Sequence, residues 1–251
     1  MTFALIVLAT LAGGLVSVLL AASLALTVLQ RHANLMVSFA VGALLTAAFI
    51  GMLPHALESG LPAEQVGGWV LAGLLGFFLL EKSTLWRHSH GGDMHTGELK
   101  TVVPMVVIGD ALHNFVDGVA IAAAFMVDTH LGIATAVAIL LHEIPQELAD
   151  FMVLLAAGLS RRRALTLNLL SGAATVTGGV LGYFILDNAR PMLPVVLALA
   201  AASFIYIAVS DLVPHLQRQS GLRASALQLL LIATGGVTAL LGSVMTHAHA
   251  H

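Results

Sequence analysis

Cysteine is absent from this chain of 251 residues, and charged residues make up only 9% of it. Without cysteine, the protein forms no disulfides and offers no thiolate ligands to a metal. Soluble domains carry about a quarter charged residues, so the low charge content excludes an ordinary globular domain. The few basic residues form no patch of the kind that binds nucleic acid, and we expect no nucleic-acid partner.

Long apolar runs fill the chain instead, with 59% hydrophobic residues and a mean hydropathy of +0.98. A helix needs about 20 apolar residues to cross a bilayer. We therefore predict an all-α integral membrane protein that is embedded in the lipid bilayer. The eight predicted transmembrane helices are residues 4–29, 35–57, 66–86, 101–127, 131–158, 164–186, 192–216 and 223–246. Because they use most of the chain, we expect residues 1–251 to form a single transmembrane domain.

The basic residues predict the orientation of this domain. All but Arg190 of the ten Lys and Arg residues fall on one side of the eight-helix arrangement. Positive residues concentrate in cytoplasmic loops, so both termini are expected to be extracytoplasmic. The connection at about residues 87–100 then becomes a His-rich cytoplasmic loop, and such tracts hold metal loosely. The low lysine content and the short loops favour a bacterial inner membrane.

Polar side chains gather on one face of the fourth predicted helix and on one face of the fifth. In the fourth, the spacing i, i+3, i+4, i+7 puts four residues on one stripe: Asp110, His113, Asn114 and Asp117. In the fifth, five residues share a face: His142, Glu143, Gln146, Glu147 and Asp150. Ionisable residues within a membrane are expensive and usually mark a site or a pathway.

The chemistry of these residues favours a divalent cation. Imidazole suits Zn²⁺ and other late first-row metals, whereas carboxylates and amides suit harder ions. The five acids in the set would repel one another unless cations or protons neutralised them. Asp110 and Asp150, taken alone, fit ligand support and structural pairing equally well. In the sixth predicted helix, Ser171, Thr175 and Thr177 are expected to form interhelical hydrogen bonds.

The same residues resemble the signatures of the ZIP family, the Zrt- and Irt-like metal transporters. The segments His-Asn-Phe-Val-Asp-Gly at 113–118 and His-Glu-Ile-Pro-Gln-Glu at 142–147 are similar to its fourth-helix and fifth-helix motifs. Leu-Pro-His-Ala-Leu at 53–57 and Asp-Leu-Val-Pro-His at 211–215 also look like family segments. We identify the chain as a bacterial member of this family. The resemblance implies an eight-helix transporter, a homodimer, an elevator-like movement and passage of Zn²⁺ into the cytoplasm.

The resemblance also implies a two-metal centre between the fourth and fifth helices. The residues that match its primary position are His113, Asp117, His142 and Gln146. Those that match the adjoining position are Asn114, Asp117, Glu143 and Glu147. Gln146 departs from the usual His, which leaves the choice among Zn²⁺, Fe²⁺, Mn²⁺ and Cd²⁺ open. The metal is a transported substrate, so we expect no catalytic cofactor.

Two other functions compete with transport. An intramembrane zinc metalloenzyme, such as a protease, is suggested by His142-Glu143, because a His-Glu-X-X-His helix binds a catalytic zinc. However, Gln146 stands at the fifth position, and Pro145 is expected to interrupt the helix. A metal sensor would need an output domain, and the predicted helices leave no room for one. We therefore predict a transporter and not an enzyme, with His55 and Glu58 forming either an access site for metal or a polar helix end.

Overall fold

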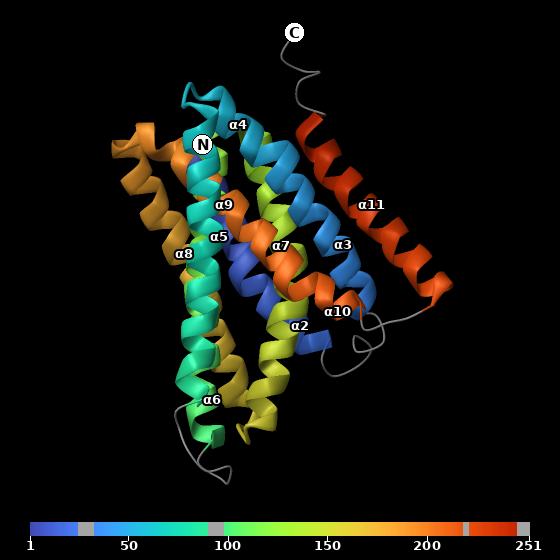
Figure 1. Cartoon of the computed structure of the whole chain (residues 1–251). Helices are drawn as coiled ribbons and strands as arrows, with labels where there is room; N and C mark the ends of the chain where they lie inside the picture. The colour runs from blue at the N-terminus through green and yellow to red at the C-terminus, as the bar shows by residue number, and fades with distance from the viewer. Residues whose placement is uncertain (25–32, 90–97, 218–220, 245–251) are drawn as a thin grey trace.

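The computed structural model describes residues 1–24, 33–89, 98–217 and 221–244 (Figure 1). Within these ranges every regular element is a helix and no strand occurs, so the all-α prediction is confirmed. The middle of the predicted His-rich loop, residues 90–97, lies outside the described residues.

The helical elements follow one another with short connections. They are α1 (Thr2–Leu11), η1 (Ala12–Val16), α2 (Ser17–Leu24), α3 (Ala33–Thr46), η3 (Ala47–Met52), α4 (Leu53–Glu58), α5 (Ala63–Ser89), α6 (Glu98–Val127), α7 (Thr129–Ala156), α8 (Arg161–Asn188), η4 (Arg190–Met192), α9 (Leu193–Tyr206), η5 (Ile207–Leu212), α10 (Val213–Gln217) and α11 (Leu222–Val244). The segments η1, η3 and η5 are π-helical and continue the helices on either side of them.

Seven helical stretches among the described residues are long and apolar enough to cross a membrane. Helix α7 is not one of them, although at 28 residues it is as long as α8. It differs from a plain membrane helix in carrying buried polar residues, among them His142, Glu143 and Glu147. The structure therefore confirms a multi-pass membrane protein but does not by itself confirm the predicted count of eight crossings.

Two of the π-helical segments stand immediately before a proline. At the end of η3, the N–H of Leu53 bonds to the carbonyl of Ala48, five residues earlier, and Pro54 follows. The N–H of Val213 likewise bonds five residues back at the end of η5, just before Pro214. Proline has no N–H and its ring crowds the preceding turn, so a wider turn relieves the helix at these points.

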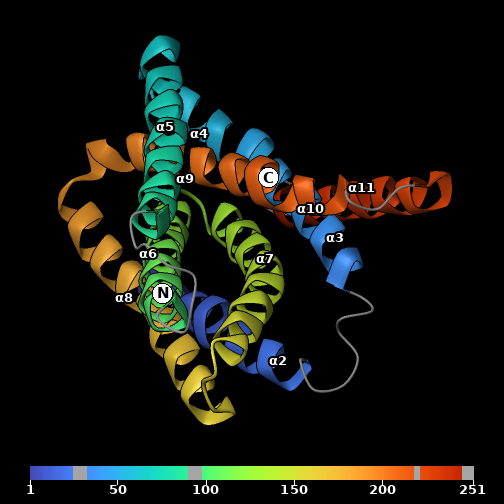
Figure 2. The same ribbon diagram turned by 60° about the horizontal axis from the view of Figure 1, so that its bottom comes forward.

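Helices α6 and α8 lie side by side (Figure 2), and glycines let their backbones come close together. A Cβ on Gly118 would lie 2.0 Å from the carbonyl oxygen of Thr175, and one on Gly178 would lie 2.1 Å from that of Phe115. Small residues allow this kind of approach in membranes, as the sequence suggested. The contact fixes α6, which carries half of the polar residues, against α8.

A single residue joins α6 to α7. Asp128 caps α7, and its carboxylate accepts hydrogen bonds from the backbone N–H groups of His130 (2.8 Å) and Leu131 (3.0 Å). Burial alone would raise the pKa of Asp128, but these two donors outweigh it and lower that pKa. His113 lies 15 residues before this turn and His142 lies 14 residues after it. At about 1.5 Å per residue, the two imidazoles therefore reach the same depth in the bundle.

Candidate metal site

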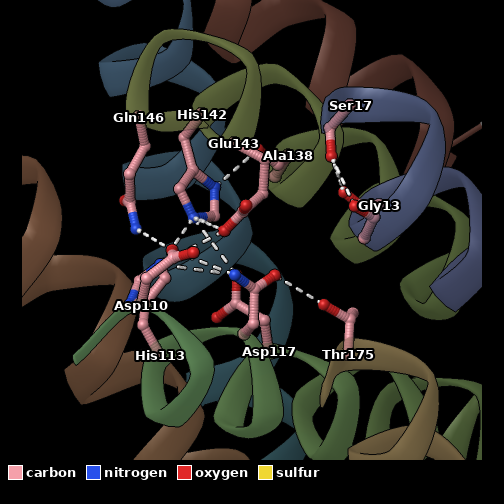
Figure 3. Close-up of polar contacts among 12 residues, drawn as sticks. Gly13, Ser17, Asp110, His113, Asp117, Ala138, His142, Glu143, Gln146 and Thr175 are labelled. Carbon is pink, nitrogen blue, oxygen red and sulfur yellow. Dashed lines mark hydrogen bonds and ion pairs between the residues drawn. The ribbon is translucent and has the colours of Figure 1, made fainter. Parts of the chain in front are cut away.

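Four side chains from α6 and α7 converge on one point (Figure 3). They are His113 and Asp117 of α6 and His142 and Glu143 of α7, and one ligand atom of each lies within 4.8 Å of all the others. The helical spacing explains the arrangement, because each helix turns its polar stripe toward its neighbour across the Asp128 turn. Prediction from the sequence had placed these four residues in the site.

The distances among these atoms fit a small divalent cation. The Nε2 of His142 lies 3.3 Å from the Nε2 of His113 and 3.1 Å from the Oδ2 of Asp117. The Oε1 of Glu143 lies 3.4 Å from the Nε2 of His113 and 3.6 Å from that of His142. Ligands placed tetrahedrally at about 2.0–2.1 Å from Zn²⁺ are roughly 3.3 Å from one another. The group is thus spaced as the ligands of one ion.

The orientation of His142 exposes a lone pair to the centre of this group. Its Nδ1 lies 3.1 Å from the carbonyl oxygen of Ala138, and because a carbonyl only accepts, the Nδ1–H is the donor. In the neutral ring the Nε2 then carries no proton and faces the other ligand atoms. Metal-binding histidines are commonly held in this way by their second nitrogen. The ring of Phe204 packs edge-on against the imidazole, with centroids 6.2 Å apart.

The carboxylates of the group are buried and lack hydrogen-bond donors. Asp117 and Glu143 are 0% exposed, and none of their four oxygens has a hydrogen-bond partner. Glu147, one turn further along α7, is equally buried and its carboxylate also has no partner. Buried charges are costly unless they are paired or coordinate a metal. A bound cation would offset the negative charge of all three.

The two predicted amide ligands are engaged by the protein in this structure. The Nδ2 of Asn114 donates to the Oδ1 of Asp110 (3.0 Å), and the Nε2 of Gln146 approaches the same oxygen at 3.4 Å. The Oδ1 of Asn114 accepts from the hydroxyl of Thr175 on α8 at 2.6 Å. Asp110 thereby links α6 to α7, which is the structural pairing that the sequence had left open.

Glu147 and the two amides thus lie beside the four converging residues rather than among them. The division into a primary and an adjoining position stays a prediction. Thr175 is confirmed as an interhelical hydrogen-bond donor. Thr177 was predicted wrongly, because it donates to the carbonyl of Ala173 in its own helix. Ser171 likewise donates to carbonyls of its own helix, those of Leu167 and Asn168. The carbonyl of Ala138 and the ring of Phe204 were not predicted. Nothing in the sequence distinguishes them from the other apolar residues of their helices.

Comparison with known proteins agrees with this site. The family described as ZIP Zinc transporter matches residues 82–242, which is more than half of the chain and includes both polar motifs. Zinc transporter ZIP13 of Pongo abelii is 35% identical over 231 residues, covering 85% of this chain and 67% of that protein. Zinc transporter ZIP6 of Homo sapiens is 42% identical over 134 residues, 51% of this chain and 18% of its own length.

Metal cation symporter ZIP8 of Homo sapiens is 40% identical over 119 residues, 47% of this chain. The alignment spans only 25% of that protein, so the chain matches a part of the longer relatives and most of the shorter one. The match to ZIP13 and the match of residues 82–242 both run across α6 and α7. With its paired imidazoles and acids on those two helices, the chain belongs to the ZIP zinc transporter family.

Proposed function

We propose that this protein carries a divalent transition-metal ion, with Zn²⁺ as the main substrate, across a membrane into the cytoplasm. The observation that carries the proposal is the group formed by His113, Asp117, His142 and Glu143, whose ligand atoms lie within 4.8 Å of one another inside the helical bundle. Two imidazoles with two carboxylates suit Zn²⁺, and also Fe²⁺, Mn²⁺ and Cd²⁺. Several relatives carry zinc transport in their names, and one is named a metal cation symporter.

Three further residues belong to the proposed ligand set. Glu147 has a buried carboxylate without a partner, and it would hold a second ion or the departing one. Asn114 and Gln146 would complete the coordination by exchanging their contact with Asp110 for the ion. A site of nitrogen and oxygen ligands releases its ion more readily than a thiolate site, as a transporter requires.

An access route is offered by a pocket at the end of α4. It has a volume of about 530 Å³, and the residues that line it include His55, Glu58, Val127 and Arg190; we call it the His55 pocket. We propose that the ion enters here from the outside. The site itself is more exposed on its other side, where His113 is 15% exposed and Asp150 is half-buried. The exposed residues Asp211 and His215 would receive the ion as it leaves.

The topology completes the proposal. Helices α6 and α8 are both apolar enough to cross the membrane, and α7 runs between them with one connecting residue on one side and four on the other. This supports the proposal that α7 crosses as well, which would give eight crossings. With both termini extracytoplasmic by the distribution of basic residues, residues 1–251 form one transport domain with a cytoplasmic His-rich loop. A bacterial inner membrane and a homodimer belong to the same proposal.

Close glycine contacts support an elevator-like movement. Gly14 meets Gly172 and Gly118 meets Thr175, which binds η1 and α6 to α8. Gly42 meets the backbone of Ile232, which binds α3 to α11. We propose that η1, α6, α7 and α8 move together and carry the ion past α3 and α11.

A metalloenzyme is less well supported. Catalysis at His142-Glu143 would need Glu143 as a base for a metal-bound water, but its carboxylate lies among the ligand atoms themselves. Gln146, at the position of the second zinc histidine, faces Asp110 instead. Pro145 lies inside α7 without ending it, so the expected interruption of this helix was wrong. The relatives named above are transporters.

Zinc flux into proteoliposomes tests the proposal. Protein reconstituted around a zinc-sensitive dye should show flux above that of protein-free vesicles. The double variant His113→Ala, His142→Ala should fall to the protein-free level, while the control His130→Ala at the start of α7 should retain its flux. Competition by Fe²⁺, Mn²⁺ and Cd²⁺ would rank the ions. Flux in the double variant equal to that of the unmodified protein would rule out this site.

A further inference from the structure

Thr135 of α7 carries a buried hydroxyl with no hydrogen-bond partner. It is 0% exposed, and its Oγ1 makes no hydrogen bond with any described group. Serine and threonine in helices normally bond to a carbonyl three or four residues back. In this structure Thr10 does so with Ile6 (2.9 Å), and Thr166 does so with Arg162 (2.9 Å). An unused buried hydroxyl lowers stability, so its presence calls for an explanation.

The position of Thr135 offers an explanation for its unpaired hydroxyl. It precedes His142 by seven residues, which is two turns, so both side chains leave α7 on the same face about 10 Å apart. It also follows Asp128 by seven residues, and Val127, next to Asp128, lines the His55 pocket. Thr135 therefore lies halfway along α7 between the level of the pocket and the level of the site.

The rest of this stretch of α7 is apolar where it is buried. Leu131 is 2% exposed and Ile139 is 0% exposed, one turn to either side of Thr135. An ion travelling along this face covers about 20 Å from the level of Asp128 to His142. Partial loss of its hydration there is expensive unless the protein supplies oxygen atoms.

We propose that the hydroxyl of Thr135 is a transit contact for the ion between the His55 pocket and the site. This inference rests on the proposed transport function. The oxygen of the hydroxyl would bind the partly hydrated ion or accept a hydrogen bond from one of its waters. The residue thus sets how fast the ion reaches His142, and it leaves the strength of binding at the site unchanged.

Three variants of the full chain test the proposal with Zn²⁺ as the probe. Thr135→Val keeps the shape and removes the hydroxyl, and Thr135→Ser keeps the hydroxyl. Thr10→Val is the matched control, because Thr10 is equally buried but its hydroxyl is satisfied within its own helix. The initial rate of zinc uptake into proteoliposomes, the equilibrium zinc affinity in detergent and the midpoint of thermal unfolding are measured for each.

Thr135→Val should lower the initial rate roughly tenfold, the effect of about 1.4 kcal/mol on a barrier. Its zinc affinity should stay within about twofold of the unmodified protein, and its thermal midpoint should be equal or higher, because an unsatisfied hydroxyl is removed. Thr135→Ser and Thr10→Val should transport normally. Normal uptake by Thr135→Val, or an equal loss in Thr135→Ser, would overturn the proposal. Absence of uptake by the unmodified protein would instead refute the transport function itself.

Discussion

Hydrogen bonds to the protein decide which atoms of the site remain available to an ion. His142 donates its Nδ1–H to Ala138, which leaves Nε2 for the metal. The side-chain nitrogens of Asn114 and Gln146 point to Asp110, and the side-chain oxygen of Asn114 accepts a hydrogen bond from Thr175. The carboxylates of Asp117 and Glu143 have no competing hydrogen-bond donor, and the same holds for the neighbouring carboxylate of Glu147.

Asp128 gives a prediction about pH. Replacing it by Ala removes the acceptor for two backbone N–H groups of α7 and should lower the free energy of unfolding by about 1 kcal/mol at neutral pH. The folded-state pKa of Asp128 is lowered from its ordinary value of 3.8, so the carboxylate stabilises fully above that value and progressively less as the pH falls through the lower, folded-state pKa. Thermal unfolding in detergent measures this.

The difference in unfolding midpoint between the unmodified protein and Asp128→Ala should accordingly shrink below about pH 4. Asp128→Asn, which keeps an oxygen acceptor, should lose less at neutral pH than Asp128→Ala. A difference that stays constant from pH 7 to pH 3 would show that the charge of this cap does not stabilise α7.

Spacing along each helix predicted that the polar residues of α6 share one face and that those of α7 share another. It did not single out His113, Asp117, His142 and Glu143, whose ligand atoms converge in the structure. Spacing could not predict which polar group the side-chain amides of Asn114 and Gln146 would contact. Gln146 could reach either an ion or Asp110, and the choice depends on distances between helices. The isolation of Thr135 was also invisible, because an absent partner is a property of the surroundings and not of the residue.

At the level of single helices, the polar residues of the proposed site make α7 less typical of a membrane-spanning helix. It carries a stripe of polar and acidic residues and is not among the seven stretches that qualify as membrane spans, yet it packs at the centre of the bundle (Figure 2). Burial among the other helices shields these residues from lipid. The predicted helix at 131–158 nevertheless agrees closely with α7 at Thr129–Ala156, because apolar residues surround the polar stripe.

The π-helical segments were not predicted. Pro54 and Pro214 marked the places where a helix must adjust, but proline alone is compatible with a kink, a break or a wider turn. The choice is made by the packing of the whole helix. The helix from Ala33 to Glu58 and the helix from Leu193 to Gln217 both continue past their proline without a break.

The α6–α8 contact yields a paired prediction. Gly118→Ala would place a Cβ 2.0 Å from the carbonyl oxygen of Thr175, so α6 must move away from α8. We expect a loss of about 3 kcal/mol in the free energy of unfolding and weaker zinc binding, because the Thr175–Asn114 hydrogen bond is disturbed with it. Thermal unfolding and zinc titration measure the two effects.

The control for this variant is Gly109→Ala in the same helix. A Cβ at Gly109 meets nothing within 4 Å, so the change should be neutral or stabilise by about 0.5 kcal/mol. If the two variants had equal stability, close contact between α6 and α8 would not be what holds the site in place.

For the whole molecule, the proposed metal site lies between two helices that meet at Asp128, with apolar packing around it. The apolar stretches of the sequence predicted an integral membrane protein, and the comparisons confirm the family. The direction of transport depends on asymmetry between the two ends of the bundle: the His55 pocket at one end and the half-exposed polar residues at the other. Sequence reveals such asymmetry only through its basic residues.

The central claim is that α6 and α7 grip one cation together, and zinc K-edge X-ray absorption tests it most directly. Purified protein carrying one equivalent of zinc should show nitrogen and oxygen ligands at about 2.0–2.1 Å, with the outer-shell scattering of two imidazoles. His113→Ala on α6 and His142→Ala on α7 should each remove one imidazole from that pattern. Spectra that are identical in the unmodified protein and both variants would contradict the claim, because the zinc would then be bound elsewhere.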